Sequence, residues 1–104
     1  DLVEATGGGE WLRNLLTKFL DHTAGQVRTL ETSIDGDDFV LVAETAHSAK
    51  SSSKTVGAVA LGEAFAALEH AAKTATSDVS PAYQRVTGEF ERAKAAMQDY
   101  LDTL

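Results

Sequence analysis

The chain has 104 residues, of which 43% are hydrophobic and 24% are charged, and this length and composition are typical of one soluble globular domain. Its 9 basic and 16 acidic residues give a formal net charge of −7, which argues against a nucleic-acid partner because phosphate backbones bind basic surfaces. The absence of cysteine excludes disulfides, zinc fingers and thiol catalysis, and it fits a reducing compartment.

The N-terminal residues were compared with targeting signals as a guide to location. The first four residues, DLVE, do not resemble a signal peptide, and no apolar run in the chain approaches the roughly 20 residues of a membrane span. We therefore expect a cytoplasmic location without direct membrane contact. Because the sequence does not begin with Met, we expect it to be a piece of a longer protein. Three consecutive glycines predict a linker over residues 1–9, followed by a domain over residues 10–104.

Apolar residues at helical spacing run through the rest of the chain. These stripes predict helices at about 10–22, 24–35, 37–53 and 58–76, and a last helix from Ser80-Pro81 to about residue 103. No stretch has the period of two that is typical of a strand. The expected fold is all-α, an antiparallel four-helix bundle with a possible additional short helix.

Individual residues mark the expected helix ends. Gly25 is a weak point near the start of the second helix. Asp37 is expected to cap the third helix, and Ser80 and Pro81 are expected to begin the last one with a capping hydroxyl and a proline in the first turn. His22 is expected at the end of the first helix, where it would interact with the helix dipole.

The segment AHSAKSSSK, residues 46–54, places His47 among small residues. At about 100° per residue, Val42 and Ala49 fall on the core face of this helix and His47 points to solvent. The residues on the side of His47 are Ala43, Glu44, Lys50, Ser51 and Lys54. Small neighbours leave room for a partner's backbone, and lysines favour a negatively charged group on this face.

An exposed neutral imidazole is a nucleophile at physiological pH. A phosphoryl group bound to it would carry negative charge, which Lys50 could screen from one helical turn away. The residues around His47 therefore predict a reversible anion or phosphoryl site.

The same residues resemble the histidine-containing phosphotransfer (HPt) domain of bacterial and plant phosphorelays. The pattern of that family is approximately A-H-x-L-K-G-x-[SA], then L-G-A, then a closing L-E. Residues 46–53, 56–58 and 68–69 match these three parts in order. The resemblance is clear over about residues 10–75.

The resemblance implies a phosphorelay intermediate that is not itself an enzyme, as one domain of a hybrid sensor histidine kinase. His47 would accept a phosphoryl group from an aspartate of one receiver domain and pass it to another, and Lys50 would stabilise the phosphoryl charge. The docking surface would include exposed apolar positions on the first helix and Ala43, Glu44, Ser51, Ser53 and Lys54. The receiver would supply Mg²⁺, so the resemblance implies no intrinsic cofactor or metal and a monomeric domain.

Two departures from the family pattern leave alternatives open. Ala49 stands at the usual core leucine, and Ser51 stands beside the imidazole at the usual glycine. A degenerate adaptor that binds a receiver without accepting phosphate is one alternative, and the phosphotransfer domain of a chemotaxis-type kinase is another. A dimerising kinase core is disfavoured because Ser48, not an acidic residue, follows the histidine.

Other kinds of site fit the sequence less well. The three histidines lack the spacing of metal ligands, and His70 is expected to be solvated. The serines at 51–53 have no partner base or acid for nucleophilic catalysis.

Overall fold

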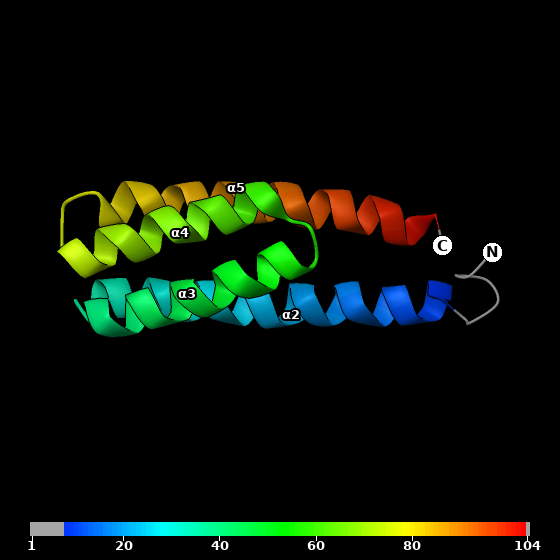
Figure 1. Ribbon diagram of the computed structural model, residues 1–104, viewed down its shortest axis with the longest axis horizontal. Coiled ribbons are helices and arrows are strands. Elements are labelled where there is room, and N and C mark those ends of the chain that lie inside the picture. Colours follow the sequence, from blue (N-terminus) through cyan, green and yellow to red (C-terminus); the bar gives the residue numbers. More distant parts are fainter. Residues whose placement is uncertain (1–7, 104) are drawn as a thin grey trace.

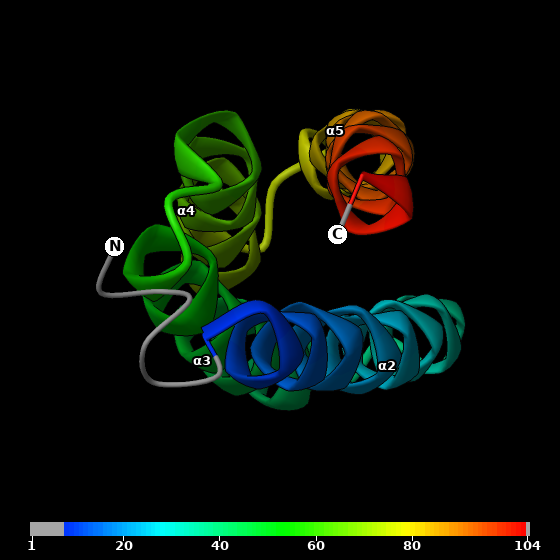
Figure 2. The same cartoon turned by 90° about the vertical axis from the view of Figure 1, so that its right-hand side faces the viewer.

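The computed structural model describes residues 8–103, which form four helices. These are α2 (Gly8–Asp35), α3 (Phe39–Thr55), α4 (Val59–Thr74) and α5 (Val79–Asp102), and short turns join them in an antiparallel arrangement (Figure 1). Each helix packs against two others, α3 between α2 and α4, and α5 against α4 and α2 (Figure 2). The predicted all-α four-helix bundle is confirmed. None of the four described helices is both long and apolar enough to cross a membrane.

Helix α2 is one continuous helix of 28 residues, where the sequence pattern predicted two. A glycine inside a helix costs about 1 kcal/mol, so Gly25 weakens α2 without ending it. Thr23 and Leu30, on either side of this glycine, are fully buried in the bundle, and this packing outweighs the local cost. His22 consequently lies within α2, away from both helix ends, so the expected interaction with a helix dipole was wrong.

The start of α2 overlaps the predicted linker. Residues 8 and 9 are helical, whereas the linker was expected over residues 1–9. The other seven positions of that linker lie outside the described residues. The domain boundary at residue 10 therefore stays a prediction.

The three turns of the bundle share one hydrogen-bond pattern. In each turn a residue with a left-handed backbone is followed by a residue whose N–H bonds to a carbonyl five positions earlier, which is the Schellman motif. The left-handed residues are Asp37 (φ 56°), Gly57 (φ 84°) and Ala75 (φ 49°). In these hydrogen bonds the backbone N–H of Asp38 donates to the carbonyl of Ser33 (2.8 Å), that of Ala58 to Ser53 (2.8 Å) and that of Thr76 to Ala71 (3.3 Å). These turns reverse the chain within a few residues, which makes consecutive helices antiparallel.

The cap of α3 is Asp38 and not Asp37. Oδ1 of Asp38 accepts a hydrogen bond from the backbone N–H of Leu41 at 3.2 Å. Asp37 cannot take that role because its left-handed backbone belongs to the preceding Schellman motif.

Helix α5 begins before the predicted pair Ser80-Pro81. Its first residue is Val79, and Asp78 precedes it without a capping side-chain bond. Ser80 is therefore not the cap, and Pro81 is the third residue of the helix. The missing N–H of this proline still falls in the first turn, where backbone N–H groups have no partner within the helix. Helix α4 ends at Thr74, two residues before its predicted end.

Small residues line the inner face of α3. Val42, Ala46 and Ala49 are fully buried, as the helical phase predicted. Gly62 of α4 also lies close to α3, since a Cβ added there would be 3.0 Å from Cγ of Lys54 and 3.6 Å from the carbonyl oxygen of Lys50. This short separation between α3 and α4 brings side chains of α4 to the face that carries His47.

A histidine, a buried glutamate and two lysines between α3 and α4

His47 projects from the middle of α3 toward the edge of α4. Its side chain is 62% exposed, in agreement with the predicted direction of this residue. On α3 its neighbours at i−4 and i+4 are the small residues Ala43 and Ser51.

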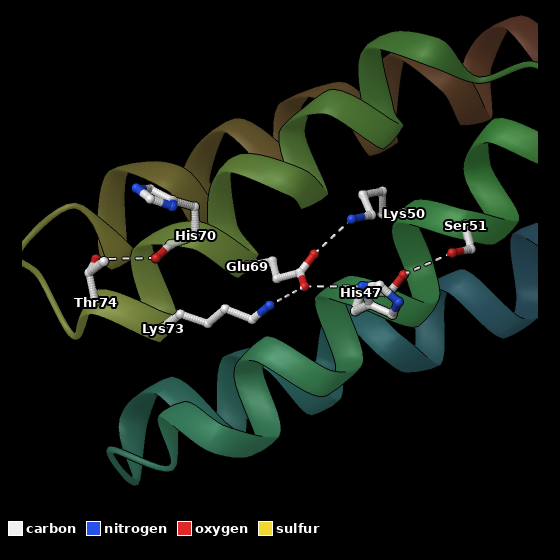
Figure 3. Close-up of polar contacts among 7 residues, drawn as sticks. All are labelled: His47, Lys50, Ser51, Glu69, His70, Lys73 and Thr74. Carbon is white, nitrogen blue, oxygen red and sulfur yellow. Dashed lines mark hydrogen bonds and ion pairs between the residues drawn. The ribbon is translucent and has the colours of Figure 1, made fainter.

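The carboxylate of Glu69, on α4, lies at the centre of the site (Figure 3). Its Oε2 is 3.0 Å from Nδ1 of His47, and its Oε1 accepts a hydrogen bond from Nζ of Lys50 at 3.0 Å. Lys73, one turn further along α4, places its Nζ 2.9 Å from Oε2. The side chain of Glu69 is only 8% exposed, so these three contacts replace most of its hydration.

Glu69 is ionised at neutral pH despite its burial. Burial is the largest single influence and would raise its pKa, but hydrogen bonds from Lys73, Lys50 and His47, with the charge of Lys50, outweigh it. Together they lower the pKa of Glu69 from 4.5 to about 2. An ionised carboxylate has no proton to donate, so it acts here only as an acceptor.

This acceptor determines which ring nitrogen of His47 carries the proton. Because Glu69 can only accept, Nδ1 must donate, and the neutral imidazole then has its lone pair on Nε2. In Figure 3 the second ring nitrogen of His47 points away from Glu69. In its neutral form the ring therefore directs the lone pair of Nε2 away from Glu69, on a side chain that is 62% exposed.

Lys50 does not point outward as the helical phase suggested. Its side chain is 24% exposed and its ammonium group is bound to Glu69. The angular positions of residues around one helix describe only neighbours on that helix, and they showed no acidic partner for Lys50. The carboxylate that turns Lys50 inward comes from α4.

The residues expected in the docking surface divide into two groups. Glu44, Ser51 and Lys54 are exposed, and the hydroxyl of Ser51 donates to the backbone carbonyl of His47 at 3.3 Å. Ala43 is only 9% exposed and contributes little surface of its own, and its part in docking stays a prediction. It still lines a shallow surface pocket with Glu44, His47, Glu69 and Lys73.

Ser53 is excluded from a docking surface. It is fully buried, and its hydroxyl donates to the carbonyl of Ala49 at 2.7 Å. His70, in contrast, is exposed on α4, as expected for a solvated histidine. Within residues 8–103, no group of three or more His, Cys, Asp or Glu side chains is placed to hold a metal ion.

Glu69 and Lys73 are the site residues that the sequence analysis missed. The L-E pair at residues 68–69 belonged to the family pattern, but no role was attached to its glutamate. An acidic residue followed by lysine four positions later is common on exposed helix faces. The sequence did contain one indication of a role for Glu69, its match to the L-E pair of the family pattern. That match did not show that the side chain of Glu69 turns inward.

An apolar groove runs between α2 and the C-terminal part of α3. Leu15 and Phe19 of α2 and Val56, the residue that caps the end of α3, provide its apolar part. The remaining lining residues are polar and come from the same two helices: Lys18, His22, Ser52 and Thr55. The sequence analysis expected exposed apolar positions on the first helix without ranking them, and Leu15, 37% exposed, is one that borders this groove.

The fold and the site together define a class of protein, an all-helical bundle with one accessible histidine nitrogen and lysines beside it. The family model of the Hpt domain matches residues 14–104, and the chain belongs to this family. Hpt domains are phosphocarriers of two-component signalling that interact with the receiver domains of response regulators. Comparison with curated proteins and with solved structures gave no match to this chain.

Proposed function

We propose that His47 is the phosphoacceptor of a phosphorelay, taking a phosphoryl group from a receiver aspartate and passing it to a second receiver. The observation that carries this proposal is the hydrogen bond between Nδ1 of His47 and Oε2 of Glu69. It leaves Nε2 as an unprotonated nucleophile on an exposed side chain.

The proposed phosphoryl transfer from the receiver's aspartate to Nε2 of His47 forms one bond and breaks one bond. The lone pair of Nε2 attacks phosphorus, the P–O bond to the receiver's aspartate breaks, and the aspartate leaves as a carboxylate with the bonding pair. The ring keeps its proton on Nδ1 and gains a positive charge, which the carboxylate of Glu69 stabilises. The reverse reaction returns the phosphoryl group to a receiver without any other proton donor.

The phosphoryl group needs cations because it carries a charge of about −2. Lys50 is the proposed partner on this chain, since its ammonium group binds the same carboxylate as the imidazole, through the other oxygen of Glu69. Mg²⁺ is proposed to reach the reaction on the receiver, and no cofactor of the domain itself is invoked.

The receiver is proposed to dock over His47 and the groove between α2 and the C-terminal part of α3. Glu44, Ser51 and Lys54 are exposed around the imidazole, and the groove offers the apolar surface that a protein partner can cover. In this proposal the domain acts as a monomer in the cytoplasm, within a hybrid sensor histidine kinase. A chemotaxis-type kinase is the alternative parent protein.

The test is phosphoryl transfer from receivers labelled with radioactive phosphate, in the presence of Mg²⁺. The wild-type domain should acquire phosphate that is stable to base and labile to acid, and His47→Gln should acquire none. Label retained in His47→Gln would move the site to another residue. A wild-type domain that binds several phosphorylated receivers and takes label from none of them would be the degenerate adaptor, for which Ser51 at the usual glycine is the structural argument.

A further inference from the structure

Glu69 has more partners than the orientation of one histidine requires. Its two oxygens accept from Nδ1 of His47, Nζ of Lys50 and Nζ of Lys73, at distances from 2.9 to 3.0 Å. A single acceptor would be sufficient to hold the proton on Nδ1. The second lysine therefore calls for a separate explanation.

The contact of Lys50 with Glu69 conflicts with a role at the phosphoryl group. The ammonium group that should bind the phosphoryl oxygens is held on Oε1 of Glu69. If Lys50 moves to a phosphoryl group on Nε2, it leaves a carboxylate whose side chain is only 8% exposed. Loss of one partner from a buried carboxylate is costly, and a second ammonium group that stays on Glu69 lowers this cost.

Lys73 provides that ammonium group from the helix that carries Glu69 itself. It lies four residues after Glu69 on the same helix, so the contact between them is independent of α3. It binds Oε2, whereas Lys50 binds Oε1, and the two lysines do not compete for one oxygen. In Figure 3 the two ammonium groups approach the carboxylate from different sides.

We propose that Lys73 is a positioning residue, the permanent counter-ion of Glu69, which allows Lys50 to move from the carboxylate to the phosphoryl group on His47. This inference rests on the proposed function, because it concerns the same histidine. The two lysines have different tasks. Lys73 keeps the carboxylate paired in both states, and Lys50 changes its partner when the phosphoryl group arrives.

The charges of the site support this division. Before transfer, two ammonium groups and one carboxylate leave a single net positive charge beside a neutral imidazole. A phosphoryl group of about −2 on a ring that carries one positive charge brings the site close to neutral. Without Lys73 the phosphorylated site would have a net negative charge, because Lys50 would be the one ammonium group shared by Glu69 and the phosphoryl group.

One experiment needs no receiver. Phosphoramidate transfers its phosphoryl group to an imidazole nitrogen as its P–N bond breaks and ammonia leaves. The full chain, labelled with ¹⁵N, is phosphorylated in this way, and the lysine ammonium signals are followed by NMR before and after. The signal of Lys50 should shift on phosphorylation and that of Lys73 should stay. A shift of Lys73 with an unchanged Lys50 would overturn the division of tasks.

A second experiment measures transfer from a phosphorylated receiver to the wild type and to Lys73→Met, Lys73→Arg and a control, Lys94→Met, which removes the same charge from α5. Lys73→Met should lower the maximal transfer rate about tenfold, the effect of one charged hydrogen bond, with little change in the receiver concentration at half saturation. Lys73→Arg should recover most of the rate, and Lys94→Met should match the wild type. Wild-type transfer by Lys73→Met, or an equal loss in Lys94→Met, contradicts the inference.

The two experiments separate this inference from the function on which it rests. If receivers do not transfer phosphate but phosphoramidate labels His47 and shifts Lys50, only the proposed relay fails. If the wild type accepts phosphate and Lys73→Met does so equally well, only the role of Lys73 fails. If neither source labels His47, both are wrong.

Discussion

Nδ1 of His47 lies 3.0 Å from Oε2 of Glu69, a residue 22 positions later in the chain and on the neighbouring helix. This contact links the ionised carboxylate to the ring proton, and it exposes the opposite nitrogen for reaction. It also ties the chemistry to the packing of α3 on α4, because neither residue could meet the other along one helix.

Glu69→Gln should slow transfer without removing the phosphoacceptor. The amide oxygen can still accept from Nδ1, but both lysines lose their anion and the positive ring of the phosphorylated state loses its counter-charge. We expect a fall in transfer rate of about tenfold to a hundredfold. The measurement is the initial rate of labelling, with Glu91→Gln on α5 as the control for the loss of one negative charge. A rate equal to the wild type would show that transfer does not need the negative charge of Glu69.

Acid should remove the stabilising contribution of Glu69. The pKa of this residue is about 2 in the folded chain, below its ordinary 4.5, so folding is favoured by the ionised form. The contribution is complete above about pH 4.5 and is lost as the pH falls toward 2. Urea unfolding at several pH values should show the wild type losing its advantage over Glu69→Gln across this range. A difference between the two proteins that is constant from pH 7 to pH 3 would contradict the low pKa.

Lys50→Ala should reduce stability as well as transfer. The rotation of the helix predicted Lys50 on the solvent side beside His47, and removal of an outward-pointing lysine would leave the fold unaffected. In the structure it pairs with a carboxylate that is only 8% exposed, and its loss should lower the free energy of unfolding by about 1 to 2 kcal/mol. Lys54→Ala, an exposed lysine of the same helix, is the matched control. Equal urea midpoints for the two variants would show that the ion pair of Lys50 is not stabilising.

Ser51→Gly tests the departure from the family pattern beside the imidazole. The hydroxyl of Ser51 folds back onto the carbonyl of His47, so it makes no contact with the ring itself. Transfer should be unchanged or faster because glycine leaves more room for the receiver, while the helix loses about 0.5 kcal/mol of stability. Labelling rates and urea unfolding of the same protein measure both effects. A clearly slower transfer would mean that the hydroxyl takes part in docking or in the reaction.

Ala75→Gly should stabilise the bundle. Ala75 adopts a left-handed backbone (φ 49°) at the end of α4, a conformation that glycine adopts without steric cost. We expect a gain of about 0.5 to 1 kcal/mol in the free energy of unfolding. Gly57→Ala, in the equivalent position after α3, should have the opposite sign. A loss of stability in Ala75→Gly would indicate that the methyl group of Ala75 contributes packing that outweighs the backbone strain.

The features that the sequence determined by itself are those that depend on neighbours along one helix. Apolar spacing determined the all-helical class, and the phase of α3 correctly placed Val42 and Ala49 inside and His47 outside. Local preferences were less reliable at helix ends. Gly25 did not break α2, because the burial of a long helix face outweighs the cost of one glycine.

The tertiary structure alone decided which charged groups meet. The approach of α4 to the small residues of α3 brings Glu69 to His47 and turns Lys50 inward, and it places Lys73 at the same carboxylate. The helical phase contains no information on the relative position of two helices, because that position depends on how both surfaces pack. The sequence thus located the histidine, and the packing of α3 against α4 produced the site around it.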